Sequence, residues 1–399
     1  MSTKMSKPKF ILFCAALILT HVISMHDMVI YPIVNNLYEL FYENMAGVNF
    51  IISGPAIFMF VASLLAPYIM KVIDKKTLLI IACVIFAVFS IGGAAVTSVT
   101  YMIIARSICG FMYGIVQVVV IGIVADHFID DNKRATFMGV YNAGMAAIGA
   151  VMSAVAGVLA VNGWKNAYYT YLISIPMILL VIFFVPKIQA KIEETQEEAK
   201  TADVSAVKAK GGFSAKFWIM LITFFVLCVA YTPMMMMTSV YIAENALGNE
   251  ALAGLAGSVG TIASGLFCLL FGLVYSKLKA RTSLISYAGV GIALLGMYFI
   301  KGPAIFLVFC AIAGATYGFL YSYMFTQVIV LVAPENANKA ISYLTAVYAA
   351  SIFIGPYATT WIMGMVGDSI TTASLIFGII CIVCLVVDFF NTAKMRSAE

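Results

Sequence analysis

The chain has 399 residues, of which 63% are hydrophobic and only 10% are charged, and its formal net charge is +5. Water-soluble domains carry about 45–50% apolar and about 25% charged residues. This composition excludes a soluble enzyme, a secreted disulfide scaffold and a disordered protein, and the small net charge argues against a nucleic-acid partner. The chain is predicted to lie in a lipid bilayer.

Long apolar runs dominate the sequence. A helix needs about 20 apolar residues to cross the hydrocarbon layer of a membrane. The runs lack the alternation of barrel strands and are too long for them. The sequence therefore predicts an all-α membrane protein with twelve transmembrane helices. They cover residues 10–34, 47–70, 77–97, 100–124, 135–160, 167–186, 217–243, 251–275, 283–300, 303–331, 339–364 and 370–390.

Positive charges lie almost entirely on one side of these spans. With a cytoplasmic N-terminus, 20 of the 23 Lys and Arg residues fall in inside segments, whereas only Lys165 and Lys301 fall outside. Such a bias orients membrane proteins and predicts that both termini are cytoplasmic. We expect a multi-pass protein of the plasma membrane, which is the inner membrane if the source is a Gram-negative bacterium.

The two halves of the sequence repeat. Gly110-Phe-Met-Tyr113-Gly114 returns about 205 residues later as Gly314-Ala-Thr-Tyr317-Gly318. Repeats of this type predict two six-helix bundles related by a pseudo-two-fold axis, with a solute site between them at mid-membrane. The predicted domains are an N-terminal bundle (1–186), a cytoplasmic linker (187–216) and a C-terminal bundle (217–399).

One motif in the fourth span makes the pattern specific. Arg106-Ser-Ile-Cys-Gly110-Phe-Met-Tyr-Gly114 is similar to the R-x-x-x-G-x-x-x-G signature of the major facilitator superfamily. Together with the twelve spans and the repeat, it makes the chain resemble this family over its whole length, and its drug/proton antiporters in particular. The resemblance implies secondary active transport by alternating access.

The short basic loops also resemble those of the family. The resemblance implies a conformational gate made by four residues: Asp74, Lys75, Gly272 and Arg281. The chain departs from the family pattern where Pro67 and Lys71 stand in place of Gly and Asp, and where Ser276 replaces the second acidic residue. The fifth span also lacks the Gly-Pro of the antiporters.

Two ionisable residues lie deep in the first half. An ionisable group within a span costs at least about 2.5–3.5 kcal/mol, so it needs a partner or a role. At 1.5 Å per residue, Asp27 and Arg106 both lie in the outer third of the membrane. We expect them to pair. Their role is either proton coupling, through changes in the solvation of Asp27, or a static tie between two helices.

Polar residues line the faces that we expect to form the cavity wall. Thr20, Ser24, Asp27 and Tyr31 follow helical spacing as one stripe, in which His26 is expected to face about 100° away from Asp27. His21 either relays a proton or is a hydrogen-bonded packing residue. The candidate substrate-binding residues are His21, Ser24, Tyr31, Tyr113, Gln117, Asn142, Met145, Tyr231, Met235, Tyr317, Tyr323 and Gln327.

The seventh span contains Pro233-Met-Met-Met-Met237, which favours either a kinked, adaptable gate or ordinary packing methionines. Asp388, near the inner end of the last span, is expected to reach the membrane interface. All eight cysteines lie in apolar runs, and no sequence cluster predicts a metal or another cofactor.

Three hypotheses for the function remain, of which two are transporters and one belongs to another class of membrane protein. Spans 7 to 12 hold no deep Lys or Arg, which favours proton-coupled export of neutral or cationic amphipathic or drug-like compounds. The alternative is an importer or exchanger of a small organic acid or other metabolite, with Arg106 as the anion site. A membrane enzyme or receptor is the third hypothesis, but the sequence has no convergent catalytic cluster or phosphate-binding loop. The expected partners are a small solute, protons and lipid, and the chain is expected to act as a monomer.

Overall fold

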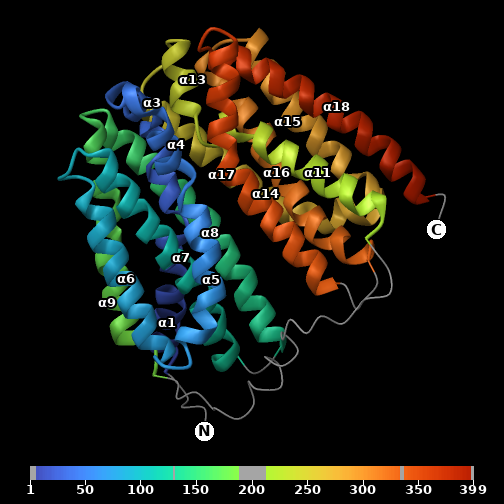
Figure 1. The fold of residues 1–399 in the computed structure, drawn as a ribbon. Helices are drawn as coiled ribbons and strands as arrows, with labels where there is room; N and C mark the ends of the chain where they lie inside the picture. The colour runs from blue at the N-terminus through green and yellow to red at the C-terminus, as the bar shows by residue number, and fades with distance from the viewer. Residues whose placement is uncertain (1–5, 129–130, 188–212, 333–336, 397–399) are drawn as a thin grey trace.

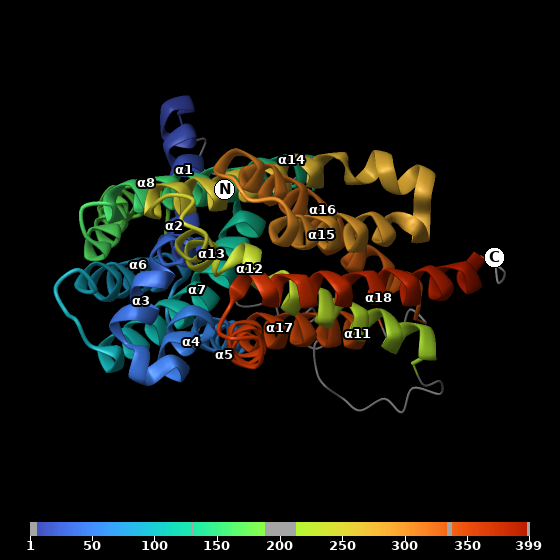
Figure 2. The same cartoon turned by 90° about the horizontal axis from the view of Figure 1, so that it is seen from above.

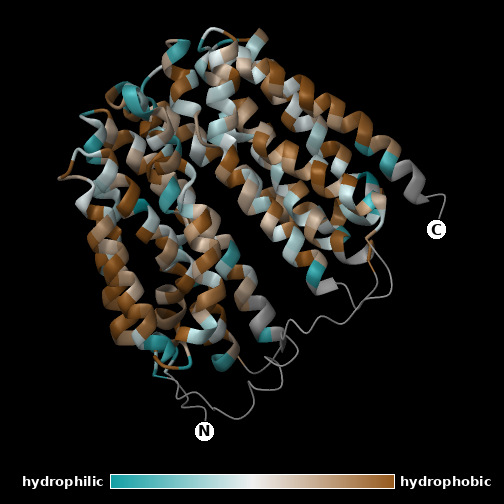
Figure 3. Cartoon of the chain, in the orientation of Figure 1, coloured by the Kyte–Doolittle hydropathy of each residue, from teal (hydrophilic) through white to brown (hydrophobic). Residues whose placement is uncertain are grey.

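The computed structural model describes residues 6–128, 131–187, 213–332 and 337–396. These residues contain eleven helices that are long and apolar enough to cross a membrane, together with the shorter apolar helix Ala215–Ala230. Hydrophobic residues run along the helices, while hydrophilic residues gather near their ends and in the connections (Figure 3). The architecture is all-helical, in agreement with the twelve predicted spans.

The first half of the chain forms one group of helices (Figure 1). Its elements are α1 (Lys7–Leu19), α2 (His21–Ser24), η1 (His26–Val29), η2 (Tyr31–Ile33), α3 (Val34–Leu40), η3 (Tyr42–Asn44), α4 (Met45–Ser53), α5 (Pro55–Ile69), α6 (Lys75–Gly92), α7 (Val99–His127), α8 (Asp131–Ala160), η4 (Trp164–Ile173) and α9 (Ser174–Phe184), where η denotes a 3-10 helix.

The second half forms the other group. Its elements are α11 (Ala215–Ala230), α12 (Thr232–Met235), α13 (Thr238–Glu244), α14 (Glu250–Leu278), η5 (Lys279–Arg281), α15 (Thr282–Phe299), α16 (Pro303–Val330), α17 (Ala337–Met365) and α18 (Ile370–Arg396). Residues 188–212, most of the predicted linker, lie outside the described residues.

The first and seventh spans are interrupted. The predicted helix 10–34 ends as a regular α-helix at Leu19 and continues as α2, η1, η2 and α3. The hydroxyl and the amide of Thr20 both donate to the carbonyl of Leu17, which tightens the turn, and Pro32 has no N–H to donate. The seventh span breaks at Tyr231 and again after Met235, around Pro233, so the kink expected from Pro233 is confirmed.

The halves meet at one end of the molecule, which we call the closed end, where α3, α4, α13 and α17 lie together. Asn49 donates to Thr360 at 2.9 Å and Ser53 donates to the Phe353 carbonyl at 3.0 Å. The two groups diverge toward the opposite, open end, where α5 ends and α6 begins (Figure 1). Seen from above, most first-half helices lie on the left and most second-half helices on the right (Figure 2). Hydrogen bonds join the halves at the closed end and at mid-helix.

Helices α8 and α14 make the most extensive contact between the halves. Ser153 donates to the Gly254 carbonyl at 2.9 Å and Ser258 donates to the Ala150 carbonyl at 2.6 Å. A Cβ atom added to Gly157 would lie 2.5 Å from the Glu250 carbonyl oxygen, so the close approach depends on glycine.

Candidate functional site

Asp27 and Arg106 form an ion pair inside the first half. Arg106 donates through Nη2 to Oδ1 of Asp27 and through Nε to the Ile51 carbonyl at 2.9 Å. Arg106 is 3% exposed, whereas the Asp27 side chain retains 28% exposure. The predicted pairing is confirmed. The guanidinium is therefore held between η1 and α4, and only the carboxylate has access to the surroundings.

The glycines of the Arg106 motif position the helix that carries it. A Cβ atom on Gly110 would lie 2.3 Å from the Pro55 carbonyl oxygen, and one on Gly114 would lie 2.3 Å from that of Met59. Helix α7 therefore packs directly on the backbone of α5, as small residues permit in membrane helices. This contact fixes the depth at which Arg106 meets Asp27.

His26 completes the cluster, contrary to the sequence expectation. Its Nε2 atom lies 3.4 Å from Oδ1 of Asp27, and its Nδ1 atom lies 2.8 Å from the Ile23 carbonyl oxygen. The imidazole is fully buried. The expected separation of about 100° assumed a continuous α-helix, but the α-helix has ended at Ser24 and the chain turns through 3-10 geometry at His26 and Asp27. The same break interrupts the predicted stripe from Thr20 to Tyr31.

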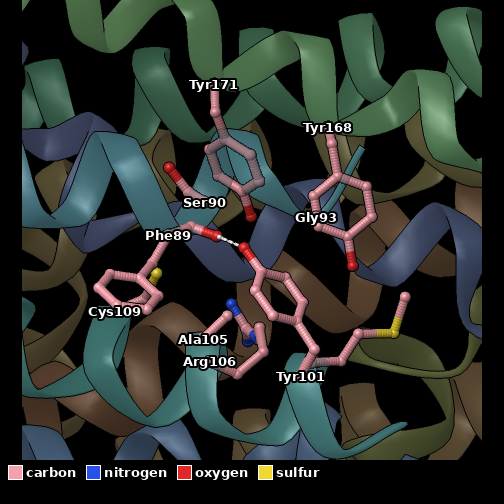
Figure 4. Close-up of a pocket in the computed structure, with 10 residues that line it drawn as sticks. Phe89, Ser90, Gly93, Tyr101, Ala105, Arg106, Cys109, Tyr168 and Tyr171 are labelled. Carbon is pink, nitrogen blue, oxygen red and sulfur yellow. Dashed lines mark hydrogen bonds between the residues drawn. The ribbon is translucent and has the colours of Figure 1, made fainter. Parts of the chain in front are cut away.

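A small cavity lies behind Arg106, between α6, α7 and η4 (Figure 4). It leaves room for about one water molecule. Within the described residues, Nη1 of Arg106 and the hydroxyl of Tyr168 have no hydrogen-bond partner. Tyr101 closes one side, where its hydroxyl donates to the Phe89 carbonyl at 3.4 Å. The cavity is lined by Phe89, Ser90, Gly93, Tyr101, Met102, Ala105, Arg106, Cys109, Tyr168 and Tyr171.

Several first-half candidates surround the ion pair at different degrees of burial. The buried His21 ring packs on Tyr141 of α8 with 3.9 Å between ring centroids, and neither ring nitrogen has a hydrogen-bond partner among the described residues. Tyr31 is buried, and its carbonyl accepts from Ser239 of the second half at 3.0 Å. The remaining candidates divide by exposure: Ser24 is buried, Tyr113 and Met145 are half-buried, and Gln117 and Asn142 are exposed.

The second half brings together only part of the predicted set. Tyr231 stacks on Tyr317 with 4.4 Å between ring centroids, and the half-buried Met235 follows in α12. Tyr323 is instead 1% exposed, and Gln327 accepts a hydrogen bond from Tyr275 of the neighbouring α14 at 3.3 Å. Tyr323 and Gln327 therefore pack within their own half, away from the Tyr231–Tyr317 stack.

Asp388 is a buried acid rather than a residue that reaches the interface. It is 2% exposed and accepts a hydrogen bond from the Ser283 hydroxyl at 2.5 Å. The expectation was wrong because α18 packs closely on α15, which covers the carboxylate and supplies Ser283 as a donor. The serines at the start of α15 were the available sequence signal for such a donor.

The four predicted gate residues lie toward the open end. Asp74 caps α6 and accepts from the backbone N–H of Thr77 at 3.0 Å. Lys75 forms an ion pair with Asp126 of α7 at 2.6 Å. Both contacts stay within the first half. Gly272 and Arg281 are exposed. In the described part of the chain, no three His, Cys, Asp or Glu side chains gather to hold a metal ion.

An all-helical membrane chain with two internally similar halves and an ion pair buried at depth has the architecture of a secondary transporter. The chain belongs to the Major Facilitator Superfamily, whose family model matches residues 16–338 and again 219–397. It is therefore a multi-pass membrane transporter of small-molecule solutes and not an enzyme.

Solved structures share this fold at low sequence identity. A D-xylose-proton symporter is 14% identical, with 95% of this chain and 97% of that chain covered and a TM-score of 0.71. The nucleoside transporter NupG is 15% identical, with 96% and 99% covered and a TM-score of 0.74. A bacterial homologue of the human lysosomal transporter Spinster, in an inward-facing and unoccupied conformation, is 14% identical, with 98% and 99% covered and a TM-score of 0.70. A search of curated proteins finds no match.

Proposed function

We propose that the chain exports small amphipathic, neutral or cationic compounds in exchange for protons. In this proposal the units 1–186 and 217–399, joined by the linker 187–216, rock against each other around a solute held between them. Tyr231, Tyr317 and Met235 would offer aromatic and thioether surface to an apolar or cationic solute. Tyr113, Gln117 and Asn142 would face it from the first half.

The observation that carries proton coupling is the pair of Asp27 with Arg106. The carboxylate is the accessible partner, with 28% of its side chain exposed, and the guanidinium is covered. Taking up a proton on the Asp27 side would neutralise the carboxylate and leave Arg106 as a buried, uncompensated charge. The conformational states of the transporter would then differ in how well they tolerate each protonation state. A static tie between η1 and α7 would require no such difference.

The organic-acid alternative needs a cation that is available to a carboxylate solute. Arg106 already donates to Asp27 and to the Ile51 carbonyl, and its remaining Nη1 faces a cavity with room for about one water. These contacts favour the exporter over the anion importer. Because the structural neighbours include a xylose symporter and a nucleoside transporter, uncharged hydrophilic solutes belong in the test.

The conformation is also relevant to the direction of transport. If both termini are cytoplasmic, as the positive charges predict, the open end faces the cytoplasm. An exporter would load its solute in this conformation.

The test uses purified protein in proteoliposomes with an acidic lumen. Four probes are offered outside: ethidium, uridine, D-xylose and lactate. We expect ethidium to accumulate as protons leave, and Asp27→Asn to abolish accumulation while ethidium exchange without a gradient persists. Glu43→Gln, which replaces an exposed acid in η3 with its amide, is the matched control and should accumulate ethidium normally.

Two results would contradict the proposal. Uphill movement of ethidium by Asp27→Asn would remove Asp27 from the coupling mechanism. With the gradient reversed, so that the outside is acidic, uptake of lactate, uridine or D-xylose together with protons and without ethidium transport would replace the exporter by the importer hypothesis.

A further inference from the structure

The tautomer of the buried His26 ring is fixed by its contacts. Nδ1 lies 2.8 Å from the Ile23 carbonyl oxygen, at hydrogen-bonding distance. A carbonyl oxygen can only accept, so Nδ1 must carry the hydrogen. In the neutral ring, Nε2 is therefore the atom with the free lone pair.

That lone pair points toward an acceptor. Nε2 lies 3.4 Å from Oδ1 of Asp27, has no hydrogen-bond partner in the described part of the chain and is fully buried. An ionised carboxylate has no hydrogen to offer. Two acceptors thus lie 3.4 Å apart with no hydrogen between them, and a single proton placed there would satisfy both.

We propose that Nε2 of His26 is the atom that receives the coupled proton, with Asp27 as the counter-charge that holds it. The inference rests on the proposed proton coupling and moves the proton-binding atom from the carboxylate to the imidazole. The proton bonds to the Nε2 lone pair, no covalent bond breaks, and the new N–H donates to Oδ1 of Asp27. Loss of the proton restores the starting state.

Proton uptake by His26 would change the ion pair directly. Arg106 donates to the same Oδ1 atom, so the imidazolium and the guanidinium compete for one oxygen. The cluster of Asp27, Arg106 and His26 passes from neutral to a net charge of +1 in surroundings where unpaired charge is costly. The Arg106 contact that links η1 to α7 and α4 is thereby weakened, which couples protonation to helix packing.

The surroundings hold the ring in place. The Tyr171 hydroxyl donates to the His26 backbone carbonyl at 2.7 Å. Phe86 of α6 and Tyr113 of α7 contact the ring edge-on, with centroids 6.1 and 6.2 Å away. Helices α8 and α14 also pack against η1, but their Asp, Glu, Lys and Arg residues lie near their ends. The titratable or charged side chains of the packed elements near this turn include His21, Asp27, Tyr31, Arg106, Cys109, Tyr113, Tyr141, Tyr168 and Tyr171.

The first arm of the test reads the proton without any transport. The chain has three histidines, so ¹⁵N-histidine NMR of the whole protein in lipid gives few signals, and His26→Gln assigns those of His26. We expect Nδ1 protonated and Nε2 bare at neutral pH, and Nε2 protonated on acidification. A proton on Nε2 but not on Nδ1 at neutral pH would overturn the proposal, as would an Nε2 that stays bare at every pH where the protein remains folded.

The second arm measures gradient-driven ethidium accumulation. We expect His26→Gln to reduce accumulation at least tenfold and to flatten its pH profile, while exchange without a gradient persists. Normal accumulation with an unchanged pH profile would overturn the inference and leave the proposed function intact. If the wild type shows no proton-driven transport of any probe, the proposed function fails, and the NMR arm still decides where the cluster binds its proton, on wild-type protein alone.

Discussion

Asp74 shows how a single side chain can serve local structure in a position where the family resemblance implies a gate. It accepts from the backbone N–H of Thr77 and so satisfies one of the unpaired amides at the start of α6. The hydrogen bonds from Thr77 lower the pKa of the Asp74 carboxyl below its ordinary value. A carboxyl with a lowered pKa in the folded state stabilises the fold above its unfolded pKa, and this contribution is lost as the pH falls through the folded value.

We predict that Asp74→Ala lowers the free energy of unfolding by about 1 kcal/mol at neutral pH, the usual contribution of an N-cap. Asp74→Asn should retain most of the cap because an amide oxygen also accepts, but without the acid-dependent loss. Thermal unfolding in detergent at pH 7 and at pH 3 tests both. Equal stability of Asp74→Ala and wild type at pH 7 would show that the cap contributes nothing.

The sequence could predict the ion pair but not its third member. The free-energy cost of a buried charge and the estimated depth in the membrane were enough to predict that Asp27 and Arg106 pair. A buried charge needs a partner, and the rise of 1.5 Å per residue places both residues at the same height. His26 required the angular position of a side chain, which depends on whether the α-helix continues. Nothing in the composition of residues 20–31 marks the change to 3-10 geometry; the nearest breaker is Pro32.

At the scale of elements, hydropathy predicted the positions of the transmembrane spans well. It predicted poorly which neighbouring helix the polar side chains face. The spans are set by the thickness of the hydrocarbon layer, which acts on every helix alike. Facing depends on which neighbour a helix packs against. Tyr323 and Asp388 turn into their own half because α14, α15, α16 and α18 pack closely there, and a single sequence does not distinguish that face from one turned to the other half.

The α8–α14 crossing gives a prediction at this scale. Gly157→Ala should force the two helices apart, because the added Cβ would lie 2.5 Å from a backbone carbonyl oxygen that cannot move alone. Gly139→Ala on the same helix is the matched control, with nothing within 4 Å of its Cβ. Spin labels at Val158 and Leu255 report the separation through dipolar broadening. We expect a longer distance between the two labels in Gly157→Ala only. Equal spectra in the two variants would show that the helices accommodate the added Cβ without moving apart.

At the scale of the whole molecule, the conformation described here depends on the contacts of the closed end. The Asn49–Thr360 and Ser53–Phe353 hydrogen bonds join α4 to α17 across the halves. Such bonds hold one state of an alternating-access cycle only if they break in the other. Their removal should therefore shift the population between states while the packing inside each half remains intact.

We predict that Thr360→Val, which removes the inter-half bond and keeps the Tyr38–Asn49 hydrogen bond inside the first half, moves part of the protein out of this conformation. A net contribution of about 1 kcal/mol for one buried hydrogen bond corresponds to roughly a fivefold change in the ratio of states. Pulsed EPR distances between labels at Tyr42 and Met365, exposed at the closed end, should lengthen in a fraction of molecules. Distances between labels at Val72 and Leu278, exposed at the open end, should shorten in the same fraction. Lengthening at one end without shortening at the other would mean that the closed end frays locally and that the halves do not move as rigid units.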